Sequence, residues 1–386
     1  MKDIRIILTG IQGIVTKEEL EDKLIRKKTL RVKYGADPSR PDLHLGHYLC
    51  LRKLKQFQDL GHRVIFIIGD FTAMIGDPSG RSKTRPILKR EEVEENSKTY
   101  FEQVFKILDK DRTEVYYNSE WLSKLTPEDI IRLSAKVTIA RMIDRDDFSE
   151  RYKKGIPISL HEFLYPIFQA YDSIYIKADV EIGGSDQHFN FSLTREIMRE
   201  MGMEPQVFIT LPLLEGTDGK LKMSKSYGNS INFLDEPEDM FGKVMSIPDE
   251  LVLKYYKLIL LKEEKEIEEF VKFNPMEAKE NLAYEITRIF HGEKEAKKAR
   301  EYFDRTFRKK EIPEDIPEYR TEKKRIFEII FESKMVKSKS EARRLIRQGG
   351  IDINGKNIKD ENFIPERGEY KVKIGKRKFL KLIVEE

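Results

Sequence analysis

Residues 30–69 read LRVKYGADPSRPDLHLGHYLCLRKLKQFQDLGHRVIFIIG and contain the patterns of a strand, a loop, a helix and a second strand. The first strand is expected over residues 30–35, and the loop after it contains two prolines. The spacing of apolar residues predicts a helix over about 46–60. Residues 63–69 form a continuous apolar run, which is typical of a strand buried on both faces of a parallel sheet. This alternation predicts an α/β fold with a doubly wound parallel sheet.

The same alternation continues to about residue 232. Further strands are expected at 114–117, 180–182 and 207–211, and helices at 91–108 and 160–171. Residues 133–159 are less regular and have the character of an insertion. We therefore expect a Rossmann-like domain over residues 1–232, with an inserted connective region near residues 115–160.

The remainder of the chain predicts two further domains. Helical periodicity runs from Asp235 to about Arg305, which indicates an α-helical domain over 233–312. An acidic segment with two prolines indicates a linker over 313–322. Residues 323–386 predict a small α+β domain: a helix at 324–331, a second helix that Ser340 could cap, and strand-like runs at 351–353 and 370–384.

Composition excludes several classes of protein. Hydrophobic residues are 39% and charged residues 36% of the 386 residues, and no apolar run approaches the roughly 20 residues that a membrane helix needs. The first residues carry charges within a short apolar stretch, so we expect no signal peptide. The one cysteine, Cys50, excludes an internal disulfide and a cysteine-based zinc site. A cytoplasmic location is therefore expected.

Charge is distributed unevenly along the chain. Residues 334–386 contain 15 Lys and Arg against 8 Asp and Glu, so this segment has a net charge of +7. The whole chain has a net charge of +4, which leaves −3 for residues 1–333. A basic segment attached to a nearly neutral body is typical of nucleic-acid binding.

The motif His44-Leu45-Gly46-His47 stands where the loop meets the predicted helix. Its two histidines are three residues apart, so they would share a face of the first helical turn. A helix N-terminus offers exposed amides and the positive end of the helix dipole, both of which favour a phosphate. Imidazoles can donate hydrogen bonds to phosphate oxygens, and Gly46 would let a nucleotide approach closely. Taken alone, such a pair is more often two surface or internally satisfied histidines.

The second motif is Lys222-Met223-Ser224-Lys225-Ser226, which follows a strand and the turn signal Asp218-Gly219. Both lysines could reach phosphates from the side opposite the histidines. A lysine-rich pentamer by itself is as often a solvated surface segment.

Tyr165, Gln169 and Asp172 are spaced i, i+4 and i+7 in a predicted helix, so they lie on one face. Three polar groups on an otherwise apolar stripe indicate a pocket for a polar ligand. Taken alone, such spacing is somewhat more often a solvated face.

The two motifs, in this order and within an α/β pattern, resemble the signatures of class I aminoacyl-tRNA synthetases. The segments between them resemble the bacterial-type tyrosyl-tRNA synthetases, namely 34–37, 76–80, 165–172 and 183–187. The resemblance extends from about Thr29 to the C-terminus. It implies an ATP-dependent ligase that activates L-tyrosine to tyrosyl-adenylate and then transfers tyrosine to the terminal ribose of tRNA(Tyr).

The resemblance also implies roles for individual residues. His44, His47, Lys222 and Lys225 would be catalytic, and they would bind ATP together with Asp37, Ser39, Gly184 and Asp186. The tyrosine ammonium group would contact Asp77, Tyr165 and Gln169, and its phenolic hydroxyl would contact Tyr34 and Asp172. Gln187 would also contact the tyrosine. Magnesium would accompany ATP, without a dedicated protein metal site.

Two residues depart from the pattern of the family. Leu45 replaces the commoner isoleucine of the histidine motif and keeps an apolar side chain there. Glu181 stands where many relatives have a neutral polar residue. Whether Glu181 contacts the substrate or only closes the pocket is left open by the sequence.

The C-terminal segment resembles the small RNA-binding domain shared with ribosomal small-subunit protein four, on residues 338–346 and 349–355. Arg343, Arg344 and Arg347 would lie along one helix and bind the RNA backbone. The helical domain before it would lie on the anticodon side of the tRNA. The resemblance further implies a homodimer, with residues 133–159 near the interface and one tRNA bridging both subunits.

Two other functions are alternatives to this one. A tryptophanyl-tRNA synthetase shares the architecture, but Tyr34, Asp172 and the basic tail argue against it. A non-catalytic RNA-binding protein built on a degenerate synthetase is disfavoured because the histidines and lysines of both motifs are intact.

Overall fold

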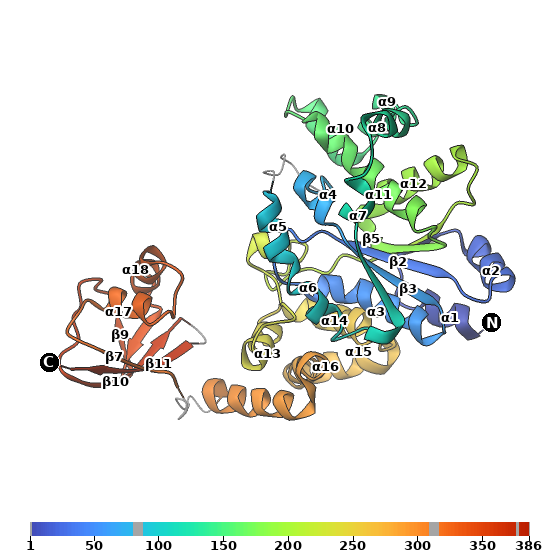
Figure 1. Ribbon diagram of the computed structural model, residues 1–386. Coiled ribbons are helices and arrows are strands. Elements are labelled where there is room, and N and C mark those ends of the chain that lie inside the picture. The colour runs from blue at the N-terminus through green and yellow to red at the C-terminus, as the bar shows by residue number, and fades with distance from the viewer. Residues whose placement is uncertain (1, 80–87, 309–315, 376–377, 386) are drawn as a thin grey trace. The chain divides into compact units, whose positions relative to one another are not determined.

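The computed structural model describes residues 2–79, 88–308, 316–375 and 378–385 (Figure 1). The chain divides into two compact units, and each is described by itself. The first comprises residues 1–235 and 246–282, and the second comprises residues 236–245 and 283–386. Within the described ranges, no helix is both long and apolar enough to span a membrane.

The first unit is built on a six-stranded sheet in the order β1-β6-β5-β2-β3-β4. Its strands are β1 (Gly13–Val15), β2 (Arg31–Ala36), β3 (Arg63–Ile68), β4 (Thr113–Tyr117), β5 (Val180–Gly184) and β6 (Val207–Leu211). Strands β2 to β6 are parallel, which confirms the predicted doubly wound sheet. Strand β1 pairs antiparallel with β6 and was not predicted.

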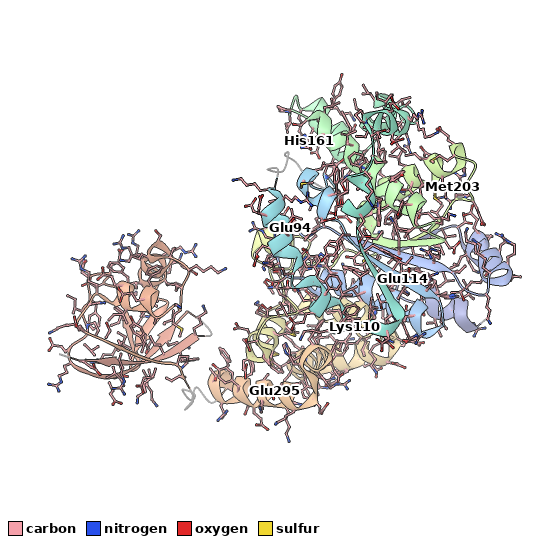
Figure 2. All side chains as sticks on the ribbon, in the orientation of Figure 1. Glu94, Lys110, Glu114, His161, Met203 and Glu295 are labelled. Carbon is pink, nitrogen blue, oxygen red and sulfur yellow. The ribbon has the colours of Figure 1, made fainter. Side chains whose placement is uncertain are left out.

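Helices cover both faces of this sheet (Figure 1). Ile65 and Ile67 of β3 pack in one core cluster with Phe168 of α11 (Leu164–Tyr175). The opposite face is covered by α3 (Leu45–Asp59), which contacts β2, β3 and β5. Glu114 lies on the edge strand β4, where it forms an ion pair with Arg63 (Figure 2). Because a parallel strand places alternate residues on opposite faces, the apolar run of β3 supplies both layers.

The single helix predicted over 91–108 is wrong, because two shorter helices occupy this range. These are α5 (Arg90–Ser97) and α6 (Tyr100–Val104). The Ser97 hydroxyl donates to the carbonyl oxygen of Glu94 at 2.9 Å, and the Thr99 hydroxyl donates to the carbonyl oxygen of Pro41. Side chains that bond to the backbone in this way compete with the helix and end it.

The region 133–159, expected to be irregular, contains ordered short helices. They are α8 (Pro127–Ser134), α9 (Ile139–Ile143) and α10 (Asp146–Lys153). Thr126 and Thr138 accept hydrogen bonds from backbone amides at the starts of α8 and α9. These caps were visible in the sequence as a threonine before each apolar run, and the region is therefore more regular than predicted.

Further helices complete the first unit and continue the chain. The helices within residues 2–122 that the sequence did not predict are α1 (Lys2–Leu8), α2 (Lys17–Arg26), α4 (Asp70–Ile75) and α7 (Ser119–Leu122). After β5 comes α12 (His188–Glu200). The helical character predicted after Asp235 is confirmed by α13 (Pro237–Met245), α14 (Val252–Ile259), α15 (Glu264–Phe273) and α16 (Pro275–Phe303), which is interrupted at Gly292.

The C-terminal part of the second unit is a five-stranded sheet with two helices. Its strands, in the order β7-β11-β10-β8-β9, are β7 (Glu318–Thr321), β8 (Ile351–Ile353), β9 (Lys356–Ile358), β10 (Gly368–Ile374) and β11 (Lys378–Val384). Helices α17 (Ile326–Glu332) and α18 (Lys339–Arg347) share one apolar core with this sheet. The predicted small α+β arrangement is present.

Two details of this part differ from the prediction. Strand β7 lies within 313–322, which we expected to be a linker, and it pairs in parallel with β11. Pro313 of that linker lies outside the described residues. The cap of α18 is Ser338 rather than Ser340, because the hydroxyl oxygen of Ser338 accepts from the amide of Glu341 at 3.1 Å.

Candidate active site

A cavity of about 1000 Å³ opens at the carboxyl ends of the parallel strands. It lies where β2 and β5 are neighbours, and from there the chain continues through α3 to β3 on one side and through α12 to β6 on the other. Loops that leave the sheet in opposite directions at such a switch point create a crevice, and ligands bind there in open α/β sheets.

Every residue that the sequence predicted for tyrosine or ATP lines this one cavity. They are Tyr34, Asp37, Ser39, His44, His47, Asp77, Tyr165, Gln169, Asp172, Gly184, Asp186, Gln187, Lys222 and Lys225. The structure thus brings together residues separated by up to 191 positions in the sequence, although their individual roles stay predictions.

The histidine motif forms the N-terminal cap of α3. His44 is the cap residue, and its Nδ1 accepts from the amide of Gly46 at 3.1 Å. The amide of His44 in turn donates to Nδ1 of His47 at 3.1 Å, and the two ring centroids are 4.0 Å apart. Since Nδ1 is the acceptor in both neutral rings, Nε2 carries the proton and is left as a donor.

Burial keeps both imidazoles neutral. It lowers the pKa of His47 to about 4, and it lowers the pKa of His44 well below the ordinary value, with His47 and Lys222 adding to the effect on His44. Neutral imidazoles with a proton on Nε2 can donate to a phosphate oxygen near pH 7 without carrying charge themselves.

The exposed amides expected at the start of α3 are already bonded. The amide of Leu45 donates to the carbonyl oxygen of Ile231 at 3.0 Å, and the amide of His47 donates to that of His44 at 2.8 Å. With the amide of Gly46 bonded to the His44 ring, the expectation of free amides was wrong. Donors for an anion at this end must therefore come from side chains.

Gly46 is required by the position of the His44 imidazole ring. A Cβ atom at this position would lie 2.9 Å from Cε1 of His44, which is closer than real Cβ contacts. The glycine therefore admits the imidazole against the first turn of the helix, a reason that differs from the nucleotide approach predicted from the sequence.

The lysine motif is joined to the histidine motif by the segment that follows it. Besides the bond from Leu45 to Ile231, the amide of Phe233 donates to the carbonyl oxygen of Leu43 at 3.0 Å. This short antiparallel bridge fixes the end of the lysine loop beside the start of α3. The turn predicted before the motif is present, with Gly219 at a φ of 70°.

Each lysine of the motif has a carboxylate partner. Nζ of Lys222 donates to Asp186 at 2.7 Å, and Lys225 forms an ion pair with Asp42. Asp42 comes from the loop before His44 and Asp186 from the loop after β5, so both lysines lie between the loops that surround the cavity. The loop before His44 is itself held by Gln103, whose side chain bonds to Leu43 and Pro41.

At the other end of the cavity, Tyr165, Gln169 and Asp172 lie on one face of α11, as their spacing predicted. The hydroxyl of Tyr165 donates to Asp37 at 2.9 Å. Oε1 of Gln169 accepts from Asn190 at 2.8 Å. The alternative of a solvated face is excluded, because Tyr165 and Asp172 are buried.

Asp172 is a buried carboxylate with two donors. Its Oδ1 accepts from Nε1 of Trp121 at 2.7 Å and its Oδ2 from Asn118 at 3.1 Å. Burial raises the pKa of Asp172 to about 6, while the charge of Lys33 and these two donors oppose the rise. Asp172 is therefore ionised at neutral pH and can accept a further hydrogen bond. Tyr34, also buried, shares the cavity with it.

Asp77 and Gln187 are held together beside α11. Nε2 of Gln187 donates to Asp77 at 2.8 Å and to the hydroxyl of Ser79 at 3.1 Å. The buried guanidinium of Arg145 donates to Ser79 at 2.6 Å and lies 3.7 Å from Asp77. Gly80, which belonged to the same predicted loop, lies outside the described residues.

Several residues of the site were missed in the sequence. Asn190 follows Gln187 by three residues, so helical spacing could have found it. Lys33 is a charged residue inside a buried strand, which was a usable signal. No spacing or composition signal indicated Trp121 or Arg145, whose positions depend on how α7 and α10 pack.

The three arginines predicted to bind RNA lie in α18 of the second unit, exposed to solvent. Arg343 lies over the ring of Phe327 at 4.3 Å, and both Arg343 and Arg347 form ion pairs with Glu361. Their placement on one helix agrees with the prediction, and their contact with RNA stays a prediction.

Two family models match the sequence. The model described as tRNA synthetases class I (W and Y) matches residues 26–308, and the model described as S4 domain matches residues 324–369. The letters W and Y are the one-letter codes of tryptophan and tyrosine. The first match includes every cavity residue named above, and the second includes α17, α18 and the strands β8 and β9.

Curated proteins resemble the chain over nearly its full length. The tyrosine–tRNA ligase of Thermotoga maritima is 54% identical, over 99% of this chain and 97% of that protein. The tyrosine–tRNA ligase of Aquifex aeolicus is also 54% identical, over 99% of this chain and 98% of that protein.

Solved structures share the fold. A tyrosyl-tRNA synthetase from Archaeoglobus fulgidus, complexed with L-tyrosine, has a TM-score of 0.65 at 24% identity and covers 78% of this chain and 99% of that one. A C-terminally truncated mitochondrial tyrosyl-tRNA synthetase from Aspergillus nidulans has a TM-score of 0.66 at 23% identity, covering 79% and 94%.

Proposed function

The chain belongs to the class I tRNA synthetases (W and Y), and from this premise we propose that it is a tyrosine–tRNA ligase. It activates L-tyrosine with ATP and transfers the tyrosyl group to tRNA(Tyr). The family match covers residues 26–308, which include every cavity residue named above, and relatives at 54% identity over 99% of the chain are tyrosine–tRNA ligases.

One observation carries the proposal: a single cavity has two chemically different ends. One end has the imidazoles of the α3 cap and the lysines of the second motif, which suit a polyphosphate. The other has a buried carboxylate, Asp172, which suits a phenolic hydroxyl, and the buried Tyr34 lines the same cavity. Phe191, Ile67 and Ile182, which also line the cavity, supply the apolar walls that the aromatic ring of a substrate needs.

In the first step, the carboxylate of tyrosine attacks the α-phosphorus of ATP. The new bond joins that oxygen to phosphorus, and the bond to the bridging oxygen breaks, so that tyrosyl-adenylate and pyrophosphate form. The reaction needs no protein nucleophile. His44 and His47 donate from Nε2 while Lys222 and Lys225 supply positive charge, so the developing charge on the pyrophosphate is stabilised by groups already in place.

The amino-acid end positions the other reactant. Asp77, Tyr165 and Gln169 hold the ammonium group, and Gln187 orients Asp77 through its 2.8 Å hydrogen bond. Asp172 accepts a hydrogen bond from the phenolic hydroxyl of the substrate, and Tyr34 contacts the same hydroxyl. A site built to bond this hydroxyl disfavours phenylalanine, because binding it would leave a buried carboxylate without its partner.

The nucleotide lies between these ends. Asp37 and Ser39 contact the nucleotide from the loop after β2. Gly184 and Asp186 contact its ribose from the end of β5. Mg²⁺ enters with ATP as part of the substrate, since this ion is usually held by substrate phosphates, waters and one or two carboxylates.

In the second step, a hydroxyl of the terminal tRNA ribose attacks the tyrosyl carbonyl and AMP leaves. The S4 domain binds the RNA, and Arg343, Arg344 and Arg347 contact its backbone. The net charge of +7 over residues 334–386 supports this partner. A cytoplasmic location follows from the presence of these substrates there.

The direct test is charging of tRNA with labelled tyrosine or tryptophan in the presence of ATP. We expect tyrosyl-tRNA(Tyr) and no tryptophanyl-tRNA. Charging with tryptophan would establish the rival synthetase, and tRNA binding without adenylate formation would establish a non-catalytic RNA-binding protein.

We also propose a homodimer. Large apolar side chains that are more than half exposed lie on consecutive elements from α8 to α11: Ile131, Ile139, Tyr152, Leu160 and Tyr175. A second copy of the chain would cover them. Light scattering should give twice the chain mass of 45.5 kDa, and Ile139→Glu should lower it. A wild-type mass of one chain would contradict the proposal.

A further inference from the structure

An ion pair joins two neighbouring strands of the parallel sheet, and both of its residues line the cavity. Lys33 of β2 and Glu181 of β5 are opposite each other in the register of the two strands. Nζ of Lys33 lies 3.0 Å from Oε1 of Glu181, and the two side chains are 2% and 3% exposed. The neighbouring residues Val32, Val180 and Ile182 are buried and apolar.

Such a pair is costly for stability. Removing two charges from water costs several kcal/mol for each ion, and replacing a buried pair with apolar residues is often neutral or stabilising. Stability of the sheet therefore does not explain why this position is charged, and the contacts of the pair must be considered.

Glu181 is bonded to the helix that lines the amino-acid pocket. Its Oε1 accepts from Nε2 of Gln169 at 3.4 Å, and its Oε2 accepts from the hydroxyl of Ser173 at 3.0 Å. The carboxamide of Gln206 also donates to it. With Nε2 turned to Glu181, Oε1 of Gln169 faces Asn190, so Glu181 determines which way this amide points.

Lys33 also interacts with helix α11, through Gln169 and Asp172. It donates to the carbonyl oxygen of Gln169 at 3.4 Å, and it lines the cavity together with Asp172. Lys33 is foremost among the groups that oppose the effect of burial on the pKa of Asp172, ahead of Trp121 and Asn118. Its positive charge thus favours the ionised carboxylate.

We propose that Lys33 and Glu181 are positioning residues that set how strongly the pocket selects a phenolic amino acid. Glu181 orients Gln169 toward the ammonium group, and Lys33 keeps Asp172 a hydrogen-bond acceptor for the phenolic hydroxyl. This inference rests on the proposed function and adds two residues that act through Gln169 and Asp172 rather than on the reacting carboxylate of tyrosine.

The test uses the full-length protein in ATP–pyrophosphate exchange with tyrosine and with phenylalanine. The variants are Lys33→Met, Glu181→Gln and the double variant Lys33→Met/Glu181→Gln. Each single variant leaves one buried charge unpaired and is expected to lower Tm, whereas the double variant removes both charges and should recover most of that loss.

A matched control is the buried pair Arg151–Glu162, which is 1% and 4% exposed and lies outside the cavity. The double variant Arg151→Met/Glu162→Gln removes a comparable pair. It is expected to change Tm and to leave the ratio of kcat/KM for tyrosine over phenylalanine as in the wild type.

We expect Glu181→Gln to raise KM for both amino acids, because both have the ammonium group. Lys33→Met should lower the tyrosine-to-phenylalanine ratio of kcat/KM about tenfold, through KM rather than kcat, a size typical of lost support for a charged hydrogen bond. The double variant should keep this lower ratio although its stability recovers.

Recovery of the ratio together with Tm in the double variant would overturn the inference, because the pair would then be only structural. Lack of any tyrosine-dependent exchange by the wild type is a different result, since it contradicts the proposed function itself.

Discussion

Asp172 is the buried residue to which the proposal assigns selection of the substrate. Its carboxylate is stabilised by three groups, the indole of Trp121, the amide of Asn118 and the charge of Lys33. Glu181 opposes them, as a second negative charge facing the same carboxylate. The balance leaves Asp172 ionised but with a pKa of about 6, close enough to neutrality to be tested by pH.

The first prediction concerns this titration. Above pH 6 the ionised carboxylate is a strong acceptor for the phenolic hydroxyl, and below pH 6 the protonated carboxyl is a weaker, uncharged acceptor, so kcat/KM for tyrosine should fall with the ionised fraction, by up to about tenfold per pH unit. Pyrophosphate exchange between pH 5 and 8 measures this. Phenylalanine should show no step near pH 6, and Asp172→Asn should abolish the step for tyrosine.

The neighbouring titratable groups do not account for such a step. Burial lowers the pKa of His47 to about 4 and that of His44 well below 6.5, so both stay neutral across most of this window. A step for tyrosine that persists in Asp172→Asn would assign it to another group.

The second prediction concerns His47. Because its Nδ1 accepts from the amide of His44, its Nε2 carries the proton, and we assign that proton to a phosphate oxygen in the transition state. His47→Ala should slow tyrosyl-adenylate formation about a hundredfold, as loss of one transition-state donor does elsewhere. Rapid-quench kinetics measure the rate, with equilibrium tyrosine binding as the control, which should be nearly unchanged. An unchanged rate would refute the role.

At the scale of elements, the start of α3 combines a structural cap with a catalytic group. His44 accepts from the amide of Gly46 on one ring nitrogen and offers the other as a donor. In the proposed mechanism the same residue both caps the helix and donates to the substrate, and the two roles can be separated by substitution.

The third prediction separates them. His44→Ala removes the cap and should cost about 1 kcal/mol of unfolding free energy, while His44→Asn keeps a strong capping residue and should restore it. Both variants lack the distal donor, so both should form adenylate slowly. Thermal or urea denaturation and rapid quench measure the two effects. Recovery of the rate in His44→Asn would show that only the cap matters.

Helices and strands could be predicted where the spacing of apolar and polar residues distinguished a helix from a strand. The apolar run of β3 and the polar stripe of α11 predicted a buried strand and a one-sided helix, and both are present. The helix break at Thr99 was not predicted, because it depends on the hydroxyl's bond to Pro41, which is 58 positions away. Strand β1 was missed for the same reason, since only its pairing with β6 makes its three residues a strand.

Residues of the candidate site could likewise be predicted only where local spacing or a motif grouped them. Tyr165, Gln169 and Asp172 could be grouped from local spacing, and the two motifs could be assigned by their resemblance to a family. Trp121 and Arg145 act through contacts made by tertiary packing, with partners 51 and 66 positions away, so no local pattern contained them.

At the scale of the whole molecule, chemistry and RNA binding belong to different segments. The cavity lies in the first unit, which has no excess of positive charge, while the +7 segment, residues 334–386, contributes α18 and strands β8 to β11 of the small domain. A chain organised this way can lose RNA affinity without losing amino-acid activation.

The fourth prediction follows from this division. Replacing Arg343, Arg344 and Arg347 with alanine should weaken tRNA binding and reduce the slope of log K against log salt by about 2. Tyrosine-dependent pyrophosphate exchange should be unchanged. The control replaces three exposed lysines of the first unit, Lys17, Lys28 and Lys110, which removes equal charge. Equal loss of binding in both variants would argue for a non-specific charge effect.

The central claim is that this cavity activates tyrosine and no other amino acid. ATP–pyrophosphate exchange by the wild-type protein, measured with each of the twenty amino acids in turn, tests it most directly. We predict exchange with tyrosine at a kcat/KM far above that for any other amino acid, phenylalanine and tryptophan included. Exchange that is faster with tryptophan, or absent with tyrosine, would contradict the account.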